Sequence, residues 1–146
     1  MVYAAHGDVV GARARLGSQP ATVRATVERE PTNVQQWEAL ARMQALLGEK
    51  AAALRANRKA SELVSGHGDI KQDQWQRFNL TMIHALTGDK AKAVAEVLRV
   101  PLAQPINNTN PISVHTLRVD PAFANLRGDP QFEARLNDPQ NNAPLF

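Results

Sequence analysis

Residues 44–53 read QALLGEKAAA, and the pattern returns as HALTGDKAKA at residues 84–93 and as YAAHGDVVGA at residues 3–12. Every copy has an alanine, two residues, a glycine, an acidic residue, three residues and a second alanine. Glycine ends a helix well because it adopts the left-handed conformation at little cost. The second alanine is small and lets the next helix lie close to the first. The pattern therefore predicts helical hairpins with very short turns.

The turn glycines are Gly7, Gly48 and Gly88, which lie 41 and 40 residues apart. The acidic residue after each glycine is expected to cap free N–H groups of the second helix, where the helix dipole also favours a negative charge. These acidic residues are Asp8, Glu49 and Asp89. Apolar spacing around the turns predicts helices over residues 8–17, 20–30, 33–47, 49–64, 71–87 and 89–100.

The composition fits a helical domain. The chain has 146 residues, of which 43% are hydrophobic, so it can bury a core. The absence of cysteine excludes disulfides and thiolate metal sites. Low aromatic content, 5%, and frequent alanine favour helix packing over a β-sandwich. No apolar run reaches the length of a membrane span. The net charge of +3 slightly favours acidic partners and is too small to indicate nucleic-acid binding.

Residues 106–146 carry a different pattern, in which Asp-Pro pairs recur every nine residues. The pairs begin at Asp120, Asp129 and Asp138. Aspartate as N-cap followed by proline is typical of a helix start. Phe123 and Phe132 follow the first two pairs at equal offsets. We expect short helices that press both phenylalanines onto the last hairpin and cover the end of the stack.

The hairpin units carry a longer set of spaced residues. One unit has Trp37, Leu40, Ala41, Gly48, Ala53 and Ala60, and the next has Leu80, Thr81, Gly88, Ala93 and Pro105. This spacing resembles the tetratricopeptide repeat family. The units depart from the family pattern at Gln44, Asn57, Ser65, Arg77 and His84. The resemblance implies an all-α superhelix of antiparallel helical hairpins over residues 1–105, the first one truncated, followed by a loop and capping helices over residues 106–146.

The tail from Leu117 to Phe132 is also similar to the ends of long bacterial tetratricopeptide proteins, in which the repeats follow a signalling module. By that resemblance the chain is the C-terminal part of a larger bacterial protein. A truncated first hairpin would fit this expectation. The missing module is not assigned by fold analogy alone.

In the family, the first helix of each hairpin lines a groove that holds a partner segment. The matching positions are Gln35, Glu38, Arg42, Leu46, Trp75, Phe78, Met82 and Leu86. The first four are expected to be exposed, with Glu38 and Arg42 setting the polarity of the groove. The set that begins at Trp75 is either an apolar binding patch or core beneath the capping tail, and burial is favoured because the tail needs a surface. In the family, a clamp for a peptide's terminal carboxylate needs lysine and asparagine at set groove positions. Such a clamp is disfavoured here, since Glu38 and Phe78 stand where those polar groups would be needed.

Catalytic chemistry has little support. The histidines are His6, His67, His84 and His115, which lie in separate elements without metal-ligand spacing, so no metal site or cofactor is predicted. His84 is expected to be a structural residue between helices. The acidic pair Asp69 and Asp73 is a weak candidate for acid–base work. The basic residues Arg55, Arg58 and Lys59 are expected to form a solvated face.

The sequence therefore predicts a non-catalytic scaffold that binds a protein or peptide partner, or another copy of itself. The alternative is a sensory or regulatory domain that controls an attached catalytic or DNA-binding module. A hydrolase on a helical scaffold is a third and weaker class. The compartment stays open, with the cytoplasm favoured over the periplasm, which would require a signal or membrane segment ahead of this chain.

Overall fold

The computed structural model describes residues 9–65, 70–100, 102 and 113–142. All regular secondary structure within these residues is helical, which confirms the prediction of an all-α chain. The turn at Gly7, with Asp8, lies outside the described residues, as do the loop at residues 106–112 and the histidines His6 and His67.

The helices before residue 65 follow the predicted order. α1 (Val9–Leu16) and α2 (Gln19–Arg29) precede the hairpin of α3 (Val34–Leu46) and α4 (Lys50–Val64). Pro20 stands in the first turn of α2, close to the start of the helix predicted over residues 20–30. Asn33 caps α3, because its side chain accepts a hydrogen bond from the backbone N–H of Gln36.

The second hairpin consists of α5 (Ile70–Leu86) and α6 (Lys90–Arg99). The tail adds α7 (Val114–Val119), the 3₁₀ helix η2 (Pro121–Leu126), α8 (Pro130–Leu136) and the 3₁₀ helix η3 (Pro139–Asn142). Asp120 caps η2 and Asp129 caps α8 through their carboxylates, and proline occupies the first turn of each helix. The prediction of Asp-Pro helix starts is confirmed at both positions.

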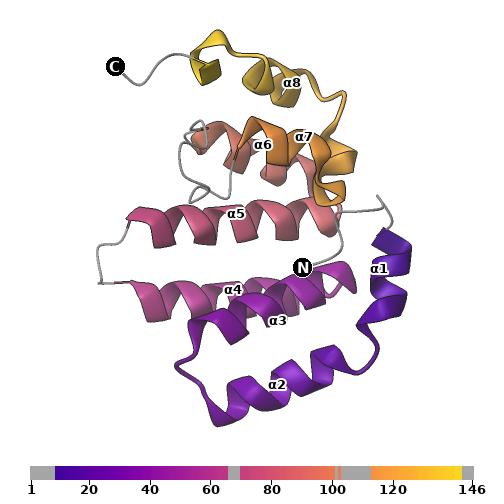
Figure 1. The fold of residues 1–146 in the computed structure, drawn as a ribbon, viewed down its shortest axis with the longest axis vertical. Coiled ribbons are helices and arrows are strands. Elements are labelled where there is room, and N and C mark those ends of the chain that lie inside the picture. Colours follow the sequence, from indigo (N-terminus) through magenta and orange to yellow (C-terminus); the bar gives the residue numbers. More distant parts are fainter. Residues whose placement is uncertain (1–8, 66–69, 101, 103–112, 143–146) are drawn as a thin grey trace.

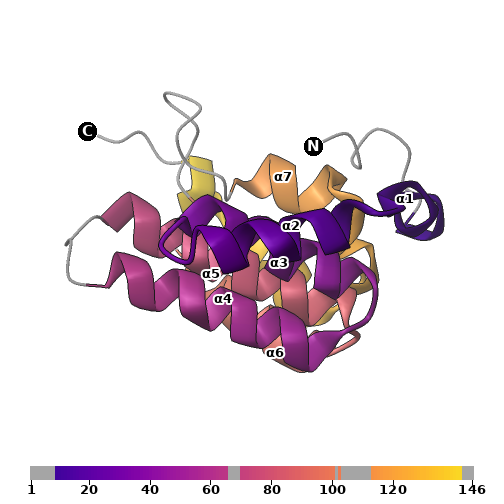
Figure 2. The same cartoon turned by 90° about the horizontal axis from the view of Figure 1, so that it is seen from below.

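The helices succeed one another along the long axis of the molecule, from α2 at one end to α8 at the other (Figure 1). α5 packs against both helices of the preceding hairpin, and α2 packs against α3. Seen along the stack, α4 and α6 lie on one side of α3 and α5, and α7 lies on the other (Figure 2). A tetratricopeptide-like superhelix remains a prediction, because the all-helical content alone does not establish it.

The two described hairpin turns are built as the glycine pattern predicts. Gly48 has φ +81° and Gly88 has φ +82°, a conformation that is costly for residues with a Cβ atom. Ala53 and Ala93 are fully buried, so the small residue of the pattern does lie at a helix contact.

The predicted carboxylate caps at these turns are wrong. Neither Glu49 nor Asp89 makes a side-chain cap hydrogen bond, although each stands at the N-cap of its helix. The Asp89 carboxylate is instead engaged by Lys50, which comes from the preceding turn. Lys50 is thus the main partner of the carboxylate, and the backbone N–H of Lys92 makes a smaller contribution to the lowering of its pKa.

A third turn continues the 40-residue period. Gly128 has φ +81°, the same value as Gly48, and it is followed by an acidic residue, Asp129. This turn joins η2 to α8, and α8 packs against α6. The nine-residue Asp-Pro pattern is plain in the sequence here and the longer one is not, because the alanine that follows the other turns is replaced by Glu133.

The tail shares a core with the second hairpin. Phe123, Phe132 and Leu126 are completely buried in one cluster with Phe78 of α5 and Val97 of α6. A second cluster joins α2, α3 and α4 to α5, with Ile83 as its contribution from α5. The expected landing of both phenylalanines on the last hairpin is therefore confirmed.

Candidate functional site

A pocket of about 500 Å³ opens between α3 and α5, and its lining residues are Gln35, Glu38, Arg42 and Trp75. The first three are spaced by three and four residues, so they share one face of α3. Trp75 reaches the same space from α5. All four belong to the predicted set of partner-binding residues, and the structure brings them together in one place.

Glu38 forms the anchored part of the pocket wall. Its Oε2 accepts a hydrogen bond from the Trp75 indole N–H at 2.9 Å, and its Oε1 accepts one from Gln76 Nε2 at 2.5 Å. Glu38 is only 4% exposed, so the expectation of an exposed position is wrong. It is buried because α5 packs over α3 and brings two donors to the carboxylate, which stabilises a charge that would otherwise be costly to bury.

Arg42 lies one helical turn beyond Glu38 and is half-buried. Its Nη1 donates a hydrogen bond to Asn79 Oδ1 at 3.1 Å, and its guanidinium carbon lies 5.9 Å from the centroid of the Trp75 ring. The second distance is within the range of a cation–π interaction. The guanidinium is therefore positioned by two groups on α5.

Phe78 and Met82, the remaining members of the predicted groove set, lie in or against the core. Phe78 is 6% exposed. The centroid of its ring lies 5.7 Å from that of Phe123 in the tail and 5.6 Å from that of Trp75. Met82 is partly buried against the same cluster. The set that begins at Trp75 was predicted to be either a binding patch or core beneath the tail. Phe78 is core beneath the tail, and Trp75 is the one member of the set that lines the pocket.

Leu46 is also buried, and the expected exposed position is wrong. It packs with Ala12 and Leu16 of α1, and the Arg13 guanidinium donates a hydrogen bond to its carbonyl oxygen. α1 therefore covers this end of α3. Leu86 is partly buried against the same residues.

Gln76 and Asn79 are two contributors that sequence reasoning missed. Both are buried, and both bind the charged residues of α3. Their signal in the sequence is a separation of 37 or 38 residues from Arg42 and Glu38, which is close to the repeat length. Such spacing places polar side chains of successive first helices side by side.

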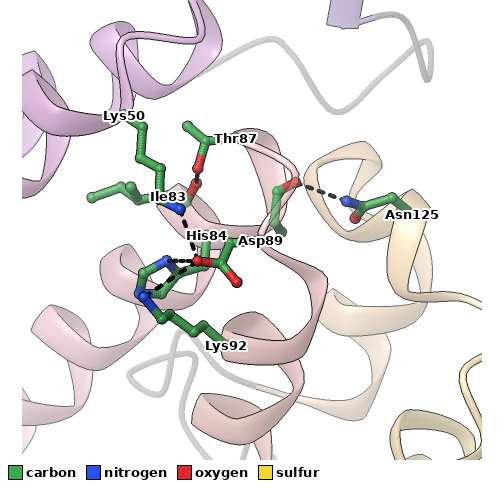
Figure 3. A network of polar contacts seen from close by, with 8 residues as sticks. Lys50, Ile83, His84, Thr87, Asp89, Lys92 and Asn125 are labelled. Carbon is green, nitrogen blue, oxygen red and sulfur yellow. Dashed lines mark hydrogen bonds and ion pairs between the residues drawn. The ribbon is translucent and has the colours of Figure 1, made fainter.

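A second polar cluster lies at the hairpin turns (Figure 3). Asp89 Oδ2 lies 2.7 Å from Lys50 Nζ, 3.5 Å from Lys92 Nζ and 3.9 Å from His84 Nδ1. The hydrogen bond from Lys50, together with the nearby positive charges, holds the pKa of the Asp89 carboxyl below its usual value. In the same view, the Asn125 amide donates to the Ala85 carbonyl at 2.8 Å, which ties η2 to α5.

His84 is 7% exposed and lies between helices, as expected. Burial lowers its pKa, and the nearby Asp89 opposes that effect only in part. His115 is exposed on α7. Among the residues that the structure describes, no group of three or more histidine, cysteine or acidic side chains is placed to hold a metal ion.

Arg55, Arg58 and Lys59 are exposed on α4, as the predicted solvated face requires. Lys59 Nζ lies 3.8 Å from Glu62 on the same helix.

Among the helices described, none combines the length and apolarity needed to cross a membrane. No protein-family model, curated protein or solved structure matches the chain.

Proposed function

We propose that this chain is a non-catalytic interaction module that binds a peptide segment of a partner protein across α3 and α5. The observation that carries the proposal is the pocket lined by Gln35, Glu38, Arg42 and Trp75, which is formed jointly by two successive hairpins. Its volume, about 500 Å³, is in the range of sites that hold small ligands or side chains.

The fixed geometry of the pocket wall supports binding. Trp75 is held by the Glu38 carboxylate and packs on Phe78, which is itself core. Aromatic and arginine side chains on a rigid support are typical anchors of protein interfaces, because little conformational entropy is lost when they make contact.

The same geometry argues against acid–base work in the pocket. Its wall holds one described carboxylate, Glu38, and each of its oxygens accepts a hydrogen bond from a neutral donor. A general acid or base has to reach a proton on a substrate, and this carboxylate is turned toward α5.

Selection of end-blocked peptides from a random display library tests the proposal. Gln35→Trp fills the mouth of the pocket from an exposed position, and Ala51→Trp adds the same side chain at an exposed site in the first turn of α4. We expect selected peptides to bind the wild type and Ala51→Trp equally, and to bind Gln35→Trp at least about tenfold more weakly. Equal binding to Gln35→Trp, or no enrichment of any peptide, would show that the pocket is not a peptide site.

A further inference from the structure

We infer that the pocket between α3 and α5 takes a side-chain carboxylate, an aspartate or glutamate within the partner segment, and that Arg42 receives it. This inference rests on the proposed function and names the chemistry of the partner.

The two opposite charges are not equally accessible. Glu38 is 4% exposed and both of its oxygens accept hydrogen bonds from α5, whereas Arg42 is half-buried. Gln35, one turn from Glu38 and two turns from Arg42, is exposed. A ligand that enters therefore meets a guanidinium and a neutral amide before it meets the carboxylate. The chain as a whole carries a net charge of +3, which favours the approach of an acidic segment.

The support of Arg42 favours a planar anion. Asn79, which is fully buried, accepts a hydrogen bond from Nη1, and the Trp75 ring lies beside the guanidinium carbon. A guanidinium has five N–H donors in one plane, so it can hold Asn79 and a ligand together. A fixed guanidinium suits a carboxylate because the two groups can form parallel hydrogen bonds.

Glu38 makes the pocket selective for a single negative charge. Glu38 lines the pocket on the same helix face as Arg42, one turn away, and its charge lies close behind the wall although both oxygens are bound to α5. A phosphate group carries nearly two negative charges at neutral pH, so its repulsion from Glu38 is greater than that of a carboxylate. A cationic side chain would meet Arg42 first. The wall thus favours an acidic residue over a phosphorylated or basic one.

The test uses end-blocked nine-residue peptides of glycine, serine and leucine that differ at the central position, which is glutamate, glutamine, phosphoserine or lysine. Binding is followed by the NMR signal of the Trp75 indole N–H, distinguished from that of Trp37 with a Trp37→Phe variant. We expect the glutamate peptide to shift the Trp75 signal at lower concentration than the other three. A glutamine, phosphoserine or lysine peptide that binds as well as the glutamate peptide would overturn the inference, as would no shift with glutamate.

Charge variants at Gln35 provide a second measurement that leaves the buried contacts intact. Gln35→Lys should tighten binding of the glutamate peptide roughly threefold, and Gln35→Glu should weaken it by a similar factor. Ala51→Glu adds the same charge at the turn end of the hairpin and should leave the Kd within about 1.5-fold. Equal effects of Gln35→Glu and Ala51→Glu would reduce the result to general charge attraction and overturn the inference. The display selection is judged separately, so the peptide site can stand when the acidic preference fails.

Discussion

Lys50 Nζ lies 2.7 Å from Asp89 Oδ2, and this ion pair joins two successive hairpin turns. Lys50 is the first residue of α4, and Asp89 precedes α6. The relationship repeats 40 residues later, where Lys90 Nζ lies 3.9 Å from Asp129 Oδ2. A lysine that follows one turn thus meets the acid of the next turn.

Replacing Asp89 with asparagine should lower the melting temperature at neutral pH. The change removes the charge that faces Lys50 and Lys92 and keeps the shape of the side chain. Because the pKa of Asp89 is lowered from 3.8, its stabilising contribution is complete above pH 3.8 and is lost as pH falls through the lower folded-state pKa. The difference between wild type and variant should therefore shrink in acid, as measured by circular dichroism melts. Asp138→Asn, which affects a longer 3.8 Å ion pair with Arg135, is the control and should have the smaller effect.

The burial of His84 predicts loss of stability in mild acid. Its pKa is lowered from 6.5, so the unfolded chain binds the proton more readily than the folded one. Stability should be unaffected above pH 6.5 and should fall as pH drops below that value. His84→Phe should flatten the change in melting temperature between pH 7 and pH 5. His115→Phe, at an exposed histidine, should keep the wild-type slope, and an unchanged slope in His84→Phe would refute the assignment.

Gly48→Ala and Gly88→Ala should each destabilise the chain by about 1–2 kcal/mol, because alanine is disfavoured in the left-handed conformation. No atom lies within 4 Å of a Cβ built at either glycine, so the cost comes from the backbone alone. Asparagine, which tolerates this conformation better, should restore part of the loss. Urea unfolding measures both. Equal stability of Gly88→Ala and wild type would show that the turn adopts another conformation.

Phe123→Ala should destabilise the whole chain by about 3–5 kcal/mol, since it removes a fully buried ring from the core shared by the tail and the second hairpin. Val119→Ala, at a side chain that is 52% exposed, should change stability by less than about 0.5 kcal/mol. Urea unfolding followed by circular dichroism should show one transition in wild type. A variant whose tail unfolds in a separate, earlier transition would contradict a shared core.

Local signals in the sequence were enough to predict the helices of the two hairpins and the Asp-Pro starts of η2 and α8, but not helix α7. Gly48 and Gly88 need a positive φ, and Asp120 and Asp129 cap the helices that begin with proline. These features depend on a few neighbouring residues. The third turn at Gly128 carries the same glycine and acid, and it was missed because the surrounding helices are short and lack the alanine of the pattern.

The site was predicted in part, because contacts between hairpins depend on how the helices stack. Counting along α3 selected Gln35, Glu38 and Arg42 as one face, and the pocket confirms that they lie together. It did not show that Glu38 would be buried by α5, nor that Asn79 would hold Arg42. Those contacts join residues that are 37 to 38 positions apart.

The lysine–aspartate ion pairs that join successive turns do not continue past the turn at Gly128. Position 130, where Lys50 and Lys90 have their counterpart, is occupied by proline, whose ring has no ammonium group to offer. Asp129 pairs with Lys90, but Pro130 beside it cannot form the corresponding ion pair with a later turn. Any unit stacked beyond α8 would therefore have to attach by some means other than this ion pair.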